Sequence, residues 1–334
     1  MRQAAILAVD GGNSKTELLL AGRDGRCLAF VRGAAISHQA VGWEAGLARL
    51  RRLVAAAREE AGVTGPGRPG RLGTFCLAGA DFRAETARLT AALGDEEVAN
   101  EILVLNDTRA ALRAGSPSGW GVAVICGSGV NAVGVAPDGR VAGLPALGNI
   151  SGDWGGGRAV GEAGLAAAIR GRDGRGPHTT LEQTVPAHFG MRRPLSVTWA
   201  LYRERIHEPD LRELSPVVFA AAIDGDAVAR GIVDRLADEL ATMALATLRR
   251  LRLLRREVDV VLAGGVMRTQ DRAFFKRIEA RVWADAPQAR IHPLTERPVI
   301  GAALLAMDRL PHAAAAERRL RHEVAARTPT DVPG

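Results

Sequence analysis

The sequence predicts an α/β protein of two domains, each a mixed sheet flanked by helices, on three observations. With 334 residues, of which 47% are hydrophobic, the chain is long enough to bury two cores. Strands alternate with helices after an opening hairpin, which is typical of a mixed sheet covered on both faces. The same opening plan recurs from Gly121, which suggests a duplication with a cleft between the halves. The expected domains are residues 1–117 and 118–334, with packing of the last helix, from about 299, back toward the N-terminal domain as an alternative.

The N-terminal half is expected to open with a strand and glycine turn over residues 7–16 and a return strand that includes the leucines 18–20. Leucines at helical spacing predict a helix over 42–60, and the glycines and prolines of 62–73 indicate a loop. The further elements predicted here are a strand over 74–80, a helix over 84–93, a strand over 101–105 and a short helix over 108–112.

The C-terminal half is expected to repeat this plan with a second strand and glycine turn over residues 122–131. The further elements predicted are helices over 159–171 and 227–251, a strand over 258–262 leading into Gly264 and Gly265, and a last helix over 299–309. No structure is assigned to the basic tail after Pro311.

Composition excludes several functional classes. The net charge of +7 is carried almost entirely by arginines that are interspersed with acidic residues, and aromatics make up 4%, so nucleic-acid binding is not expected. No apolar run of about 18 residues predicts a membrane span. The first residues lead directly into a strand, which leaves no room for a secretory signal. Cys27, Cys76 and Cys126 are widely spaced, so a reducing cytoplasm is the expected location.

The two glycine turns indicate a nucleotide-using enzyme. Glycines let successive backbone N–H groups converge on an anion, and two facing turns would hold a polyphosphate from both sides. Asp10 ends a strand beside the first turn, where a carboxylate can hold Mg²⁺ through water. Ser14, Lys15 and Thr16 offer further donors to phosphates. Alone, the Asp-Gly-Gly turn would be an ordinary hairpin turn, and the second turn and Gly264–Gly265 favour the nucleotide interpretation.

Asn106 and Asp107 follow a strand and precede a helix, which is where α/β proteins place their chemistry. Asp107 can accept a proton from a substrate hydroxyl, and the alternative is that it caps the helix. Residues 148–158 are glycine-rich and open a helix, so its free N–H groups and Asp153 are expected to face a polar ligand. The alternative is that this segment is a flexible loop. Residues 224–226 and Gly264–Gly265 predict close approach to adenosine, with a helix-start turn as the alternative for 224–226.

Together the motifs at 8–16, 106–112, 126–131, 152–153, 263–266 and 298–303 resemble the sugar-kinase/actin/Hsp70 superfamily, and within it the N-acetylglucosamine kinases grouped with the BadF/BadG/BcrA/BcrD ATPases. The resemblance implies two actin-like (ribonuclease H-like) domains closing over Mg-ATP and an amino sugar in an interdomain cleft, with transfer of the γ-phosphate to the sugar 6-hydroxyl. It implies Asp107 as the catalytic base and Asp10 as the residue that organises Mg²⁺. The nucleotide contacts implied are Gly11, Gly12, Asn13, Ser14, Lys15, Thr16, Gly127, Ser128, Gly225, Gly264 and Gly265. The sugar contacts implied are Ser37, Asp107, Val130, Asn131 and Asp153.

Three positions depart from the family pattern. Ser37 stands where an Asn usually touches the sugar, Leu147 stands where an N-acetylglucosamine kinase has Trp, and Trp154 replaces an acidic residue. The sugar is therefore open between N-acetylglucosamine, glucosamine and another hexose.

Two other functions are compatible with the same scaffold. An activator ATPase of the 2-hydroxyacyl-CoA dehydratase or benzoyl-CoA reductase type needs cysteines for a bridging iron–sulfur cluster, and only Cys126 lies in the second turn. A non-catalytic sugar sensor is disfavoured because Asp10 and Asp107 are both present. A homodimer is the family expectation.

Overall fold

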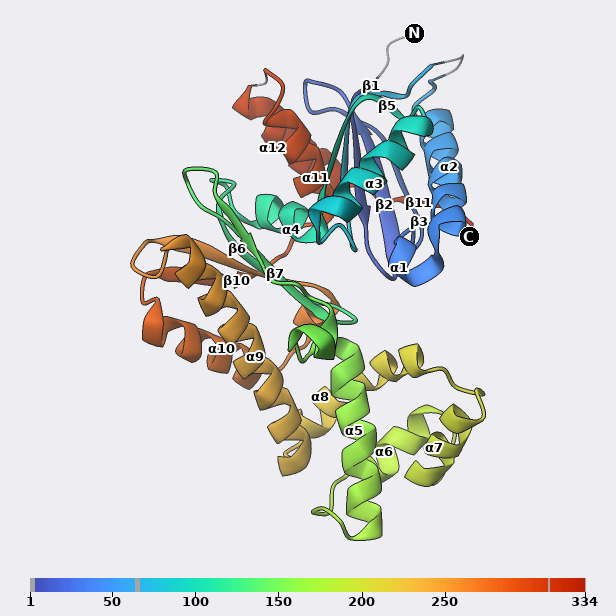
Figure 1. Cartoon of the computed structure of the whole chain (residues 1–334), viewed down its shortest axis with the longest axis vertical. Helices are drawn as coiled ribbons and strands as arrows, with labels where there is room; N and C mark the ends of the chain where they lie inside the picture. Colours follow the sequence, from blue (N-terminus) through green and yellow to red (C-terminus); the bar gives the residue numbers. More distant parts are fainter. Residues whose placement is uncertain (1–3, 64–66, 312, 334) are drawn as a thin grey trace. The chain divides into compact units, whose positions relative to one another are not determined.

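The computed structural model describes residues 4–63, 67–311 and 313–333, and the chain divides into two compact units. Unit 1 comprises Met1–Trp120 and Leu294–Gly334, and unit 2 comprises Gly121–Pro293 (Figure 1). Both units are mixed α/β, as the sequence predicts. The segment from Leu294 onward lies in unit 1, because the helix that follows it packs on the first sheet.

Unit 1 is built on a six-stranded mixed sheet with the order β11-β3-β2-β1-β4-β5. Strands β1, β2 and β3 form an antiparallel meander, whereas β4 and β5 run parallel to β1. The carboxyl ends of β1, β4 and β5 therefore meet at one edge of the sheet. The strands are β1 (Ala4–Gly11), β2 (Lys15–Ala21), β3 (Cys27–Ala34), β4 (Gly70–Leu77), β5 (Ala99–Asn106) and β11 (Thr330–Asp331).

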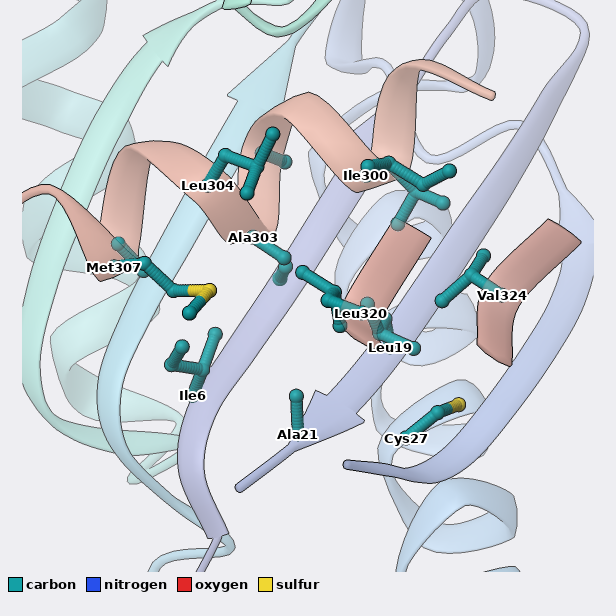
Figure 2. Close-up of a cluster of buried hydrophobic side chains, with 14 of the residues drawn as sticks. Ile6, Leu19, Ala21, Cys27, Ile300, Ala303, Leu304, Met307, Leu320 and Val324 are labelled. Carbon is teal, nitrogen blue, oxygen red and sulfur yellow. The ribbon is translucent and has the colours of Figure 1, made fainter. Parts of the chain in front are cut away.

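Helices cover both faces of this sheet, because alternate strand residues point to opposite sides. Leu7, Val9 and Phe75 face one cluster, which α2 and α3 complete. Ile6 and Leu19 face the other cluster, which α11, α12 and Ala110 of α4 complete (Figure 2). The helices of unit 1 are α1 (His38–Val41), α2 (Trp43–Glu60), α3 (Arg83–Asp95), α4 (Asp107–Gly115), α11 (Pro298–Met307) and α12 (Ala314–Ala325).

The C-terminal segment is fastened to α4. Arg113 is 6% exposed and donates to both Asp308 and Glu317. An added Cβ at Gly301 would lie 1.9 Å from the Ala110 carbonyl oxygen, so the absence of a side chain lets α11 and α4 pack closely. The tail that the sequence left unassigned thus forms α12 and β11 on unit 1.

Unit 2 contains a five-stranded sheet with the order β10-β9-β6-β7-β8, in which β6 is antiparallel to β7 and parallel to β9. The strands are β6 (Gly121–Cys126), β7 (Val130–Val135), β8 (Val141–Gly143), β9 (Val258–Ala263) and β10 (Ala289–Pro293). The long helix α9 packs on β6 and β7 and also against α10, while α5 packs with α6, α7 and α8. The helices are α5 (Gly156–Asp173), α6 (Leu181–His188), α7 (Pro194–Tyr202), α8 (Ser215–Ile223), α9 (Ala227–Leu251) and α10 (Arg272–Asp285), with 3₁₀ turns η1 (Gly148–Ser151), η2 (Glu208–Leu214) and η3 (Gly265–Arg268).

Most element boundaries agree with the sequence, and α9 agrees at both ends. The main boundary error is β4, which begins at Gly70 although residues 62–73 were interpreted as a loop; residues 64–66 of that loop lie outside the described residues. Within the described part of the chain, no helix is long and apolar enough to cross a membrane.

Candidate functional site

The first glycine turn connects β1 to β2 and exposes its tip. The Gly12 N–H donates to the Lys15 carbonyl at 3.0 Å, and the side chains of Asn13, Ser14 and Lys15 are exposed. Thr16 differs from its neighbours, because it is fully buried and its hydroxyl has no partner within the described residues. The exposed tip thus presents Asn13, Ser14 and Lys15 to a ligand but not the Thr16 hydroxyl.

Asp10 lies in a row of residues that crosses one face of the sheet. Its β2 neighbour in register is Glu17, and its β4 neighbour is Cys76. Glu17 is buried and its Oε1 contacts three cations, Arg32 at 2.8 Å, Arg297 at 2.9 Å and Lys15 at 3.4 Å. Glu17 therefore neutralises three positive side chains beside Asp10.

The ionised form of the Asp10 side chain is electrostatically unfavourable in this environment. Burial, followed by the negative charges of Asp107 and Glu17, raises its pKa to about 8, although Lys15 acts in the opposite direction. A divalent cation beside Asp10 would relieve this cost, so the residue fits a role at Mg²⁺. Among the residues that the structure describes, no three His, Cys, Asp or Glu side chains converge as a group that could hold a metal ion.

Asp107 is the first residue of α4, and Asn106 caps that helix. The Asn106 Oδ1 accepts from the Thr108 N–H at 3.0 Å, and its Nδ2 donates to the Asp81 carboxylate at 2.7 Å. Burial and then the charge of Asp81 raise the pKa of Asp107 to about 6, against the lowering effect of the Thr108 N–H. A carboxylate with a pKa near neutrality is suited to general-base chemistry.

Asp81 and Cys76 belong to the same corner and were not singled out from the sequence. The Cys76 thiol is buried, and the charges of Asp10 and Asp107 add to burial in raising its pKa. Asp81 follows β4 after Gly79, as Asp107 follows β5, so the strand-end pattern that identified Asp107 would also have identified Asp81.

Ser37 precedes α1 and is 3% exposed. It stands at the N-cap position, yet its hydroxyl makes no capping bond and has no partner within the described residues. His38, the next residue, lies beside the end of β4, because a Cβ at Gly79 would be 2.8 Å from the His38 Cε1. Ser37 thus carries a buried, unused hydroxyl close to the strand end that leads into Asp81.

The second glycine turn, between β6 and β7, is held by the start of α5. The Gly157 N–H donates to the Gly127 carbonyl at 2.7 Å, and the Arg158 N–H donates to the Ser128 carbonyl at 3.1 Å. These two N–H groups are therefore not free for a ligand, contrary to the interpretation of residues 148–158. A Cβ at Gly127 would meet no atom within 4 Å, so the turn itself has open space beside it.

Gly264 packs directly on the second turn. Its φ is +104°, and an added Cβ would lie 2.3 Å from the Cys126 carbonyl oxygen. This brings Gly264 and Gly265 to the end of β6.

Gly225, with a φ of +94°, lies in the turn before α9, and Asp226 caps that helix by accepting from the Ala229 N–H at 2.9 Å. The helix-start interpretation of residues 224–226 is thus correct for Asp226.

The predicted sugar contacts of unit 2 lie on neighbouring segments. Val130 and Asn131 begin β7, and a Cβ at Gly155 would be 2.8 Å from the Val130 Cγ1. Asp153 accepts from the Ser151 hydroxyl at 2.5 Å and is partly buried.

Two of the family departures lie on either side of Asp153. Leu147 is 41% exposed, and its N–H donates to the Ser151 hydroxyl. Trp154 packs its ring against the Arg235 guanidinium at 3.9 Å. The Trp154 ring is therefore engaged by α9 of the same unit.

Known proteins are similar to this chain in sequence and in fold. The family profile described as the BadF/BadG/BcrA/BcrD ATPase family matches residues 7–306. An N-acetylmuramic acid/N-acetylglucosamine kinase of Clostridium acetobutylicum is 27% identical over 78% of this chain and 85% of its own. An N-acetyl-D-glucosamine kinase of Dictyostelium discoideum is 24% identical over 92% of this chain and 99% of its own. The crystal structure of a proposed N-acetylglucosamine kinase from Chromobacterium violaceum has a TM-score of 0.71 at 22% identity, covering 91% of this chain and 99% of that one.

Proposed function

The chain belongs to the BadF/BadG/BcrA/BcrD ATPase family, and from that premise we propose that it is an ATP-dependent amino-sugar kinase. The reaction is transfer of the γ-phosphate of ATP to the 6-hydroxyl of N-acetylglucosamine or glucosamine. The names of the Clostridium and Dictyostelium relatives support this choice of acceptor. Cytoplasmic location and a homodimer remain predictions that accompany the proposal.

The observation that carries the proposal is the environment of Asp107. Since Asn106 fills the N-cap position, α4 does not need the Asp107 carboxylate as its cap. Burial and Asp81 bring its pKa to about 6, so the group is mostly ionised at neutral pH yet basic enough to accept a hydroxyl proton. Asp107 is thus the base that receives the proton of the sugar 6-hydroxyl as the oxygen attacks phosphorus.

The nucleotide is assigned to the glycine turns and to Gly225, Gly264 and Gly265. Ser14 and Lys15 at the exposed tip of the first turn, and Ser128 in the second, donate to phosphate oxygens. Asp10 holds Mg²⁺ through water, and the ion when bound neutralises charge on the β- and γ-phosphates. Catalysis rests on positioning and electrostatic stabilisation, without a covalent enzyme intermediate.

The sugar is assigned to Ser37, Asp107, Val130, Asn131 and Asp153. The buried and unpartnered hydroxyl of Ser37 supports this assignment, because such a group costs free energy until a ligand satisfies it. The carboxylate of Asp153 is suited to accepting bonds from sugar hydroxyls.

The activator-ATPase alternative is disfavoured by the cysteines. All three are free and buried, and burial raises the pKa of the Cys126 thiol to about 12. A buried neutral thiol is a poor candidate for a cluster ligand, since the thiolate is the ligand form.

The test is a screen for ADP release with glucosamine, N-acetylglucosamine, N-acetylmannosamine, N-acetylmuramic acid and glucose. We expect turnover on at least one N-acetylated or free amino sugar, and NMR of the product should place phosphorus on the 6-oxygen. Tight ATP binding without turnover on any of the five sugars would favour a sugar sensor and contradict the kinase proposal. Turnover with phosphorus on the anomeric oxygen would contradict the 6-hydroxyl assignment.

A further inference from the structure

Arg109 differs from every other arginine that the described structure buries wholly or in part. Nine arginines are in this group, and eight of them have a hydrogen-bond or ion-pair partner within the described residues. Arg109 has none there. The eight partnered arginines are Arg32, Arg49, Arg58, Arg68, Arg113, Arg230, Arg297 and Arg321.

Arg109 lies at the corner that carries the proposed chemistry. It is in the first turn of α4, two residues after Asp107, where helical side chains lean toward the N-terminal end. The Cys76 thiol is influenced by the charges of Asp10, Asp107 and Arg109 together, so these four side chains of unit 1 share one edge of the sheet.

The guanidinium of Arg109 is partly buried and keeps contact with water, so having no partner within the described residues costs it part of its hydration. Removing a charge from water without a partner is unfavourable, and burial accordingly lowers the pKa of Arg109. Arg113, one turn further along the same helix, shows the usual solution, because Asp308 and Glu317 both pair with it. An anionic group on a bound ligand would supply for Arg109 what Asp308 and Glu317 supply for Arg113.

We propose that Arg109 is a specificity-determining residue that binds a carboxylate substituent of the acceptor sugar. The proposal rests on the proposed function and names the acceptor class more narrowly. Asp107, on the same helical turn, is the group assigned to the acceptor hydroxyl, whereas Lys15 and the glycine turns are assigned to phosphates. The planar guanidinium matches a carboxylate with two parallel hydrogen bonds. N-acetylmuramic acid is such a sugar, since it is N-acetylglucosamine carrying a lactic acid ether, and the Clostridium relative is named for both sugars.

The experiment compares N-acetylmuramic acid with N-acetylglucosamine in the wild type and in Arg109→Gln and Arg109→Lys. Steady-state kcat/KM for both sugars is measured with ATP, and binding of both sugars is measured by calorimetry without ATP. In Arg109→Gln we expect kcat/KM and affinity for N-acetylmuramic acid to fall roughly tenfold to a hundredfold, as for loss of a charge-assisted hydrogen bond. N-acetylglucosamine should change by less than about threefold, because it lacks the carboxylate. Arg109→Lys should recover part of the loss, because lysine keeps the positive charge but cannot form the two parallel hydrogen bonds of a guanidinium.

Folding provides the control. Arg109→Gln should unfold at the wild-type temperature or above, because the variant removes an unpaired charge, whereas Arg113→Gln should unfold at a lower temperature. If Arg109→Gln unfolds earlier than wild type, Arg109 has a structural partner and the inference is wrong.

The remaining outcomes separate the inference from the function on which it rests. Equal losses on both sugars in Arg109→Gln would assign Arg109 to phosphate and overturn the inference. A wild type that phosphorylates N-acetylglucosamine but neither binds nor phosphorylates N-acetylmuramic acid would overturn it while leaving the kinase proposal intact. A wild type that phosphorylates no sugar would contradict the proposed function itself, and calorimetry would still decide whether Arg109 binds the carboxylate.

Discussion

Asp10 and Glu17 are opposite each other on β1 and β2, and three neighbouring cations pair with Glu17. Glu17 contacts Arg32, Arg297 and Lys15, whereas Asp10 has no ion pair within the described residues. The two carboxylates therefore play different parts. Glu17 joins the start of α11 to the sheet through Arg297, whereas burial and neighbouring negative charges raise the pKa of Asp10 to about 8.

Asp10→Asn should stabilise the metal-free protein at alkaline pH. The folded pKa of Asp10 is about 8 and an unfolded Asp titrates near 4, so the folded wild type holds a proton that the unfolded chain loses as pH rises. Wild-type stability from this group is therefore complete below pH about 4 and is lost as pH rises toward about 8, whereas Asn does not titrate. Urea unfolding at pH 8 without Mg²⁺ should show the variant more stable by on the order of 5 kcal/mol, with a smaller difference of about 2 kcal/mol at pH 5.5.

Loss of function should accompany this gain in Asp10→Asn, since the neutral amide no longer attracts Mg²⁺. Glu17→Gln is the matched control on the opposite strand and should instead lower stability, because it leaves Arg32 and Arg297 without their carboxylate. A variant Asp10→Asn that is less stable than the wild type at pH 8 would contradict the electrostatic account of Asp10.

Asp107→Asn should reduce phosphoryl transfer by roughly a thousandfold, which is within the range for a lost general base, while ATP affinity stays near that of the wild type. Initial rates and ATP binding by calorimetry measure the two effects. The neighbouring variant Asn106→Ala is the control, because loss of the cap should cost about 1 kcal/mol of stability and leave measurable turnover. Retained turnover in Asp107→Asn would remove Asp107 from its role as base.

The same residue predicts the pH dependence of the wild-type reaction. Because the pKa of Asp107 is raised to about 6, the proportion of the ionised base falls as pH drops through that value. The profile of kcat/KM for the sugar should therefore rise about tenfold per pH unit below pH 6 and level off above it. A profile that is flat from pH 5 to 8 would contradict an Asp base with this environment.

Much of the fold could be predicted from the sequence because its signals are local. The helix α9 carries its own apolar stripe and an Asp226 cap, so both of its ends were found. The strand β11 could not be found in this way, because its two residues are defined only by pairing with the distant β3. Helix α12 does carry a local signal, since its buried residues Ala316, Leu320 and Val324 recur every four positions.

The candidate site likewise has features that local sequence predicts and features that only the folded structure reveals. Strand-end position was enough to select Asp10 and Asp107, whose places in the site still await the experiments above. That Arg32 and Arg297 pair with Glu17, and that Arg109 has no partner within the described residues, depend on side chains brought together by folding. Polar partners of this kind are set by tertiary packing, so no spacing in the sequence reveals them.

Alanine substitutions at two glycines distinguish a structural role from a ligand-binding role. Gly264→Ala should destabilise the protein by at least about 3 kcal/mol, since the new Cβ would meet the Cys126 carbonyl at 2.3 Å and φ is +104°. Gly127→Ala has open space, so its stability should stay within about 1 kcal/mol of wild type while KM for ATP rises about tenfold. Thermal unfolding and ATP titration distinguish the two, and an unchanged KM in Gly127→Ala would exclude that turn from the nucleotide site.

Ser37 makes the sharpest prediction about the sugar, because its hydroxyl is buried and has no partner among the residues that the structure describes. Ser37→Ala removes an unsatisfied polar group, so the unfolding temperature should be unchanged or higher. If the hydroxyl serves the sugar, KM for the sugar should rise about tenfold while KM for ATP stays constant. Thr74→Val is the matched control, since Thr74 is also fully buried with an unpartnered hydroxyl but lies inside β4. It should stabilise the protein without changing either KM, and a KM for sugar that is equally unchanged in Ser37→Ala would remove Ser37 from the acceptor site.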